Sequence, residues 1–122
     1  MIKVSVLYPQ TEGMRFDMAY YVEKHMGMVR RVLGDALDHF EIDEGLSGGM
    51  PGSQPTYRAA VHMYFASTAA FYAAFGPHAK DIMNDVPNYT DARPITRFRP
   101  STAVHEPSRA ATARVMAGLH RR

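Results

Sequence analysis

The segment Tyr57-Arg-Ala-Ala-Val-His-Met-Tyr-Phe65 has the clearest strand pattern in the sequence, because apolar and aromatic side chains alternate along it. Ser67 follows and can cap a helix, since its hydroxyl can accept a hydrogen bond from an unpaired amide of the first turn. The apolar face of that helix would consist of Phe71, Ala74 and Phe75. The sequence therefore predicts a strand that leads directly into a helix.

Downstream of this unit, Gly76-Pro77 ends the helix and begins a second one, because proline suits the first helical position. The apolar side of the second piece consists of Ile82, Met83 and Val86. A turn is predicted at residues 87–90, and residues 92–99 are predicted to form the last strand.

Upstream lies a long loop over residues 47–55, which is too rich in glycine and proline for regular structure. A strand over residues 38–46 is predicted before this loop, with Phe40 and Ile42 on one face. The first strand spans residues 2–8, which are rich in β-branched side chains that roughly alternate with others.

A helix is predicted between the first two strands. Asp17 is a plausible N-cap, Gly34 is a natural stop, and Gly27 weakens the interior enough for a local kink. The apolar stripe of this helix is expected to contain Met18, Tyr21, Val22, His25, Met28, Val29 and Val32.

The resulting order β-α-β-β-α-β over residues 1–100 is the ferredoxin-like arrangement of the α+β class. Its four-stranded antiparallel sheet has helices on one face only, and so short a domain has nothing left to cover the other face. A bare sheet face favours burial against a second copy about a two-fold axis. We therefore expect a homodimer.

The composition of the 122 residues, 46% hydrophobic and 21% charged, is that of one globular domain. No apolar run is long enough to cross a bilayer and no secretory leader pattern is present, so we expect a cytoplasmic protein without a membrane partner. The absence of cysteine excludes disulfides, thiol nucleophiles and thiolate metal sites.

The positive charge is concentrated in residues 101–122, which we interpret as a basic C-terminal extension. Four arginines against one glutamate give this segment a net charge of +3, so residues 1–100 carry −1 of the total of +2. The extension has no aromatic residue on which a base could stack, and nucleic-acid binding is not expected.

Three histidines are candidates for catalysis because each lies in an apolar or aromatic setting: His25 in the first helix, His62 in the third strand and His78 after Pro77. A neutral imidazole can act as a base or donate a hydrogen bond to a carbonyl group. The alternative is that each is a satisfied core residue. No histidine pair has the spacing of a helical metal site, and no metal is expected.

Several motifs in order resemble the EthD family over roughly residues 2–98. They are Phe16-Asp17, Tyr20-Tyr21, Lys24-His-Met26, the loop from Gly45-Leu-Ser-Gly-Gly49 to Pro51-Gly52, His62-Met-Tyr-Phe65, Phe75-Gly-Pro-His-Ala79 and Pro87-Asn-Tyr-Thr90. The resemblance implies a ferredoxin-like fold that pairs into a dimeric α+β barrel. It also implies that His25, His62, His78, Asn88 and Tyr89 are the characteristic polar positions.

The same resemblance implies a connection with bacterial ether degradation, and the wider barrel superfamily contains isomerases, cofactor-free monooxygenases, cyclases and haem-degrading enzymes. Our first hypothesis is an enzyme without an organic cofactor that acts on a small hydrophobic carbonyl, lactone or aromatic compound. His25 would be its base, His62 or His78 would polarise the carbonyl group, and Tyr21, Asn88 and Tyr89 would bind substrate. A non-catalytic dimeric binding or accessory module is the second hypothesis, and haem handling through His25 or His78 is the third.

Overall fold

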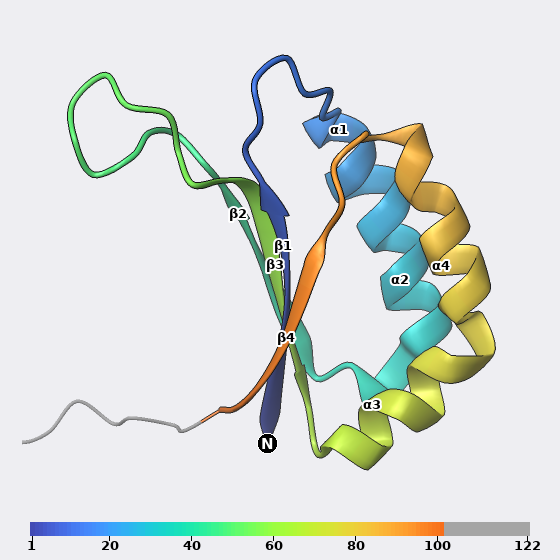
Figure 1. Ribbon diagram of the computed structural model, residues 1–122. Coiled ribbons are helices and arrows are strands. Elements are labelled where there is room, and N and C mark those ends of the chain that lie inside the picture. The colour runs from blue at the N-terminus through green and yellow to red at the C-terminus, as the bar shows by residue number, and fades with distance from the viewer. Residues whose placement is uncertain (102–122) are drawn as a thin grey trace, which may run out of the picture.

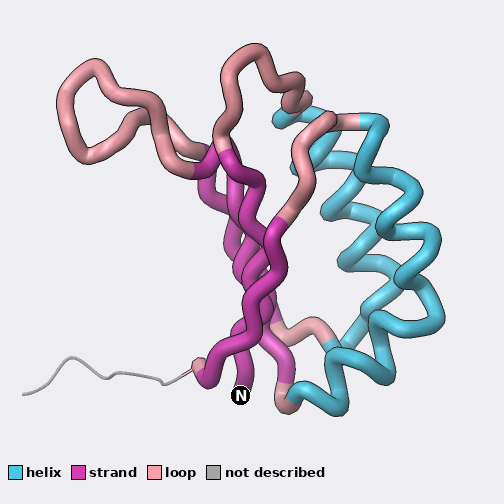
Figure 2. The backbone as a smooth tube through the Cα atoms, viewed as in Figure 1, coloured by secondary structure: helices cyan, strands magenta, loops and turns pink. Residues whose placement is uncertain are grey.

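The computed structural model describes residues 1–101, which form one four-stranded sheet with helices packed on one of its faces (Figures 1 and 2). The strands are β1 (Ile2–Pro9), β2 (His39–Glu44), β3 (Tyr57–Phe65) and β4 (Ile95–Pro100). Their order in the sheet is β2-β3-β1-β4, with every neighbouring pair antiparallel. This confirms the predicted ferredoxin-like α+β fold. The predicted C-terminal extension, apart from Ser101, lies outside the described residues.

The helical layer consists of two broken helices. The first contains α1 (Met18–Tyr20), a π-helical turn (Tyr21–His25), α2 (Met26–Leu33) and a short 3-10 turn (Gly34–Ala36). The second contains α3 (Thr68–Phe75), a 3-10 turn (Gly76–His78), α4 (Ala79–Asp85) and a last 3-10 turn (Val86–Asn88). The break at Gly76-Pro77 lies where the sequence predicts it.

Local capping explains where the helices begin and end. The Asp17 carboxylate accepts a hydrogen bond from the backbone N–H of Tyr20, and the Ser67 hydroxyl accepts one from that of Ala70. Gly34 ends α2 with a φ of 57°, a conformation that favours glycine. All three predicted caps are confirmed.

The predicted apolar stripe of the first helix is wrong in part, because the π-helical turn inserts an extra residue into the helical repeat. Val22 is 45% exposed, and the buried positions are Tyr21, His25, Met26, Val29 and Leu33. After His25, the buried positions are therefore shifted by one residue toward the C-terminus relative to those of a regular α-helix. The same turn lets Tyr21 and His25 stack, with ring centroids 5.6 Å apart and planes 14° apart.

The core lies between the sheet and the helices. It is built from β-strand residues such as Val4, Val61 and Phe65 and from helical residues such as Val29 and Phe71. Each of these side chains contributes roughly 1.5–3 kcal/mol by leaving water.

The opposite face of the sheet, called the outer face below, is not covered by any helix of residues 1–101 (Figure 2). Residues 45–56 form a loop that projects on this side of the sheet, away from the helices (Figure 1). No helix within the described range has the length and apolar character needed to cross a bilayer.

Candidate functional site

A cavity of about 270 Å³ lies between the sheet and the helices. Tyr8, Tyr21 and His25 line it near the π-helical turn, and Phe71, Phe75 and Phe98 line it near α3. The size suits a small molecule, and the aromatic lining suits an apolar one.

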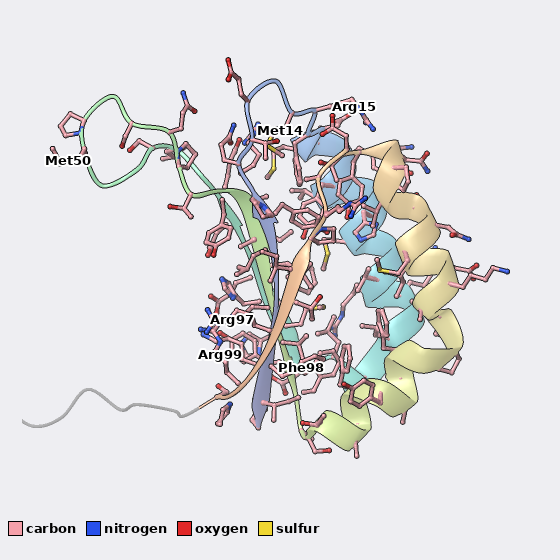
Figure 3. All side chains as sticks on the ribbon, in the orientation of Figure 1. Met14, Arg15, Met50, Arg97, Phe98 and Arg99 are labelled. Carbon is pink, nitrogen blue, oxygen red and sulfur yellow. The ribbon has the colours of Figure 1, made fainter. Side chains whose placement is uncertain are left out.

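The cavity opens between β4 and the second broken helix. Three of its lining residues, Tyr72, Met83 and Phe98, are also exposed to solvent, which places the mouth beside them. Figure 3 shows the Phe98 side chain on the helical side of β4, whereas Arg97 and Arg99 point to the other side. Access is therefore through an apolar rim.

His25 is held at the polar end of the cavity by an acidic partner. It is buried, and its Nδ1 lies 2.8 Å from the Oδ2 atom of Asp85. The other carboxylate oxygen of Asp85 accepts hydrogen bonds from the Tyr20 hydroxyl at 2.7 Å and the Asn88 amide at 3.0 Å. The Nε2 atom of His25 has no hydrogen-bond partner among residues 1–101.

The electrostatics of this pair favour a neutral imidazole beside an ionised carboxylate. Burial lowers the pKa of His25 below its usual value, although the hydrogen bond and charge of Asp85 oppose the shift. Partial burial acts to raise the pKa of Asp85, but hydrogen bonds from Tyr20, Asn88 and His25 outweigh it and lower that pKa. Near pH 7, His25 thus donates through Nδ1 and keeps a free lone pair on Nε2.

Three tyrosines form a cluster at this imidazole: Tyr21 and Tyr89 contact its ring, and Tyr8 contacts both of them. Tyr8 and Tyr89 share a hydrogen bond of 2.6 Å, and the Tyr89 ring lies 4.6 Å from that of His25. The hydroxyl of Tyr21 is fully buried and lies near the Tyr8 hydroxyl, although the two are too far apart for a short hydrogen bond. Burial raises the pKa of Tyr8, Tyr21 and Tyr89, so all three stay protonated and can donate. A buried hydroxyl without a short hydrogen bond is costly, and a ligand oxygen could satisfy that of Tyr21 only if the cavity lining moved to expose it.

The structure does not bring the three predicted histidines together. His62 lies on the outer face, because strand residues alternate and its neighbours Val61 and Met63 line the cavity. His78 is half-buried in the 3-10 turn before α4 and does not line the cavity. Of the predicted binding residues, Tyr21 lines it, Tyr89 packs behind it, and the exposed Asn88 supports Asp85.

His62 belongs to a separate polar network that is not a hydrolase triad. Its Nδ1 lies 2.7 Å from the Ser5 hydroxyl and its Nε2 lies 3.0 Å from Asp43. In serine hydrolases the serine contacts Nε2 and the carboxylate contacts Nδ1, the reverse of this arrangement. Ser5 is also fully buried, so it cannot reach a substrate as a nucleophile. Within residues 1–101, no cluster of three histidines or carboxylates could hold a metal ion.

Asp85, Tyr20 and Tyr8 are not among the site residues predicted from the sequence. Asp85 is 60 residues from His25 in the chain, and no motif joins the two. Tyr8 could have been found, because it has the same parity in β1 as the buried Val4 and therefore faces the helices.

The Asp85→Asn variant tests the assignment of charges at this site. Asp85 favours the imidazolium form of His25, so its replacement should lower the pKa of His25 further. In the wild type, the histidine Cε1 proton followed by NMR should titrate with a midpoint below the ordinary value of 6.5. A wild-type midpoint above that value, or an upward shift in Asp85→Asn, would contradict the arrangement.

Comparisons with known proteins agree with this architecture. A family model described as the EthD domain matches residues 14–93. An EthD-like protein from Ralstonia eutropha is 42% identical, with a TM-score of 0.79, and the match covers 88% of this chain and 95% of that chain. The comparison with curated proteins gives no match.

More distant solved structures share the fold. An ethyl tert-butyl ether d (EthD) family protein from Bacillus halodurans is 17% identical, with a TM-score of 0.57 over 84% of this chain and 99% of that one. A DABB family protein with a ferredoxin-like fold from Mesorhizobium loti is 13% identical, with a TM-score of 0.52 over 84% of this chain and 97% of that one.

Proposed function

Because this chain belongs to the EthD family, we propose that it is an enzyme without an organic cofactor, in which His25 moves a proton beside the carbonyl group of a small hydrophobic compound. The observation that supports this proposal is a buried neutral imidazole in the lining of an apolar cavity, held through Nδ1 by Asp85 and stacked on the ring of Tyr21. A base and a hydrogen-bond donor are the two groups needed to form and stabilise an enolate.

The substrate should be uncharged. Among residues 1–101, no lysine, arginine, aspartate or glutamate lines the cavity. A carboxylate in this space would lose its hydration without gaining an opposite charge. Ketones, lactones and aromatic compounds that carry a carbonyl group meet this requirement.

The reaction would begin when Nε2 of His25 takes a proton from the carbon next to the carbonyl group. The electron pair of that C–H bond moves onto the carbonyl oxygen, and the Tyr21 hydroxyl donates a hydrogen bond to the oxyanion. Asp85 stabilises the imidazolium through Nδ1–H. Return of the proton to another carbon completes an isomerisation. In a cyclisation, the enolate carbon instead attacks a second carbonyl group of the same molecule, and His25 gives its proton to the alkoxide that forms. Tyr21 thus takes the polarising role that the sequence analysis gave to His62 or His78.

A non-catalytic binding module is the alternative, and one observation favours it. The Tyr8–Tyr89 hydroxyl pair is satisfied internally, which leaves few polar groups for a ligand. Such a module could hold an ether or an aromatic compound and be accessory to its degradation. It would bind the same neutral molecules without exchanging their protons.

We also propose that the protein pairs with a second copy through the outer face. This face carries buried or nearly buried small and apolar side chains at its centre, including Leu7 and Ala60, although no helix of residues 1–101 lies over it. A second sheet is the partner that would cover such a surface.

Proton exchange in D₂O tests the enzyme proposal with a simple ketone in place of the natural substrate. We expect the protein to bind 2-tetralone and to catalyse deuterium incorporation next to its carbonyl group, followed by proton NMR. The matched carboxylate, tetralin-2-carboxylate, should not bind. Tyr21→Phe should weaken ketone binding by about two- to tenfold, the worth of one hydrogen bond. If the protein bound ketones and lactones of this kind but exchanged none of their protons, the result would favour the binding module.

A further inference from the structure

The cavity between the sheet and the helices has two ends that differ in chemistry. Tyr8, Tyr21 and His25 line the end next to the π-helical turn, called the polar end below. The other end, called the aromatic end below, is lined by the rings of Phe71, Tyr72, Phe75 and Phe98. The reaction proposed above takes place at the polar end and leaves the aromatic end without a role.

The strand β1 and the first broken helix both run from one end of the cavity to the other. On β1, Tyr8 lines the polar end and Val4 lines the aromatic end, where it pairs with Phe98 of β4. Four residues of strand place the Cα atoms of Tyr8 and Val4 about 13 Å apart. On the helix, His25 and Leu33 both line the cavity, and eight helical residues correspond to about 12 Å. A ligand that contacts both ends is therefore longer than a single ring.

The four rings of the aromatic end contact one another in the geometries that aromatic pairs prefer. Phe71 stacks on Phe75 with centroids 5.0 Å apart, and it meets Phe98 edge to face at 5.3 Å. Tyr72 stacks on Phe98 with centroids 5.8 Å apart. Such pairs stabilise by more than the apolar area that they bury. A ligand ring placed here would add contacts of the same type.

The rim of the mouth exposes large apolar side chains to solvent. Tyr72 is 57% exposed, Met83 is 51% exposed and Phe98 is 42% exposed, and all three also line the cavity. Figure 3 shows Phe98 pointing toward the helices, away from the side of β4 that carries Arg97 and Arg99. An apolar group at the mouth would cover these side chains and keep water from the buried polar end.

We propose that the substrate is an uncharged arylalkyl carbonyl compound, with its carbonyl group at His25 and its aromatic ring against Tyr72 and Phe98. This inference rests on the proposed function, because it places the carbonyl group beside the base. The polar end is buried and the aromatic end lies at the mouth, so the carbonyl group enters first and the ring closes the entrance. Tyr72 and Phe98 are then specificity-determining residues, which select the ring of the substrate.

A saturated compound is the competing class of ligand, since a saturated chain or ring would also fill an apolar space. Its affinity would come from leaving water alone, whereas an aromatic ring gains about two- to tenfold more from each well-placed aromatic partner. A phenyl group and a cyclohexyl group have similar sizes, and the cyclohexyl group is the more apolar. The preference is therefore best measured as the ratio of the two affinities, compared between wild type and variant.

Isothermal titration calorimetry of the full chain with 4-phenylbutan-2-one and 4-cyclohexylbutan-2-one tests the inference. Phe98→Leu keeps an apolar side chain but removes the ring, so it should lower the phenyl-to-cyclohexyl affinity ratio by about two- to tenfold. Tyr72→Leu should lower the same ratio. Phe40→Leu is the matched control and should leave the ratio unchanged, because Phe40 is a half-buried ring on β2 that does not line the cavity.

The orientation of the bound ketone is tested by intermolecular NOEs to 4-phenylbutan-2-one. Its phenyl protons should give NOEs to the ring protons of Tyr72 and Phe98. Its acetyl methyl protons should give NOEs to the rings of Tyr21 and His25. The reverse pattern, with the phenyl group next to His25, would overturn the inference.

The outcomes separate this inference from the proposed function. Ring-dependent binding in the expected orientation, without deuterium exchange, supports the ligand class and overturns the enzyme proposal. Exchange of 2-tetralone protons together with an unchanged affinity ratio in Phe98→Leu and Tyr72→Leu overturns the ligand class and leaves the enzyme proposal standing. Failure of the wild type to bind 4-phenylbutan-2-one also overturns the ligand class. Far-UV circular dichroism shows whether each variant is folded, and Tyr72→Leu decides the result if Phe98→Leu is not.

Discussion

His25→Asn should slow α-proton exchange by about two to four orders of magnitude, the usual contribution of a positioned general base. Asparagine places an N–H near the position of Nδ1, so the hydrogen bond to Asp85 can persist. The free Nε2 lone pair is lost. Because the cavity lining within residues 1–101 offers no other carboxylate or imidazole, no group can take over the role. Initial rates of deuterium incorporation measure the effect.

His39→Asn is the matched control, since His39 is an exposed imidazole on β2 that does not line the cavity. It should exchange protons at the wild-type rate. The wild-type rate should fall with decreasing pH in a range below 6.5, as His25 becomes protonated, and should level off above it. Unchanged exchange in His25→Asn would rule out the mechanism. Loss of exchange in His78→Asn would return the catalytic role to His78.

The fold could be predicted from the sequence because its signals are local. Alternation over residues 57–65 matches β3, and the caps Asp17, Ser67 and Gly34 lie where the helices begin and end. Each of these signals depends on a few neighbouring residues. The first and last residues of the strands are less well defined by such signals. The last strand begins at Ile95 and not at residue 92, because residue propensities do not define where the preceding turn ends.

The site could be predicted only in part, because its contacts join distant segments. His25 and Tyr21 were found from their apolar surroundings, but the π-helical turn that stacks their rings has no pattern of its own. The role of Asp85 depends on how α4 packs against the first helix. His62 is the instructive case. Because side chains alternate along a strand, His62 lies on the face of the sheet opposite to that of Val61 and Met63. Once the helices are assigned to the face that carries Val61 and Met63, the separation of His62 from His25 follows.

Tyr89→Ala should lower the free energy of unfolding by about 3–5 kcal/mol, as removal of a large buried ring does. Tyr89 is fully buried, and its ring contacts Tyr8, Phe16, Tyr21 and His25 with centroids 4.6–5.9 Å apart. Its backbone carbonyl also accepts a hydrogen bond from Asp17, which caps the first helix. This ring therefore joins the last turn of the helical layer to β1 and to the π-helical turn.

The Tyr89→Phe variant separates the contribution of the ring to stability from that of its hydroxyl. It keeps the aromatic packing and removes the hydrogen bond to Tyr8, so we expect a loss of about 1 kcal/mol. Urea denaturation followed by circular dichroism, with equal m-values for the three proteins, measures both differences. If the alanine variant were as stable as the phenylalanine variant, the ring cluster would not hold the polar end of the cavity. The position of His25 relative to Tyr21 would then rest on the direct stacking of their rings, although Tyr89 packs against both.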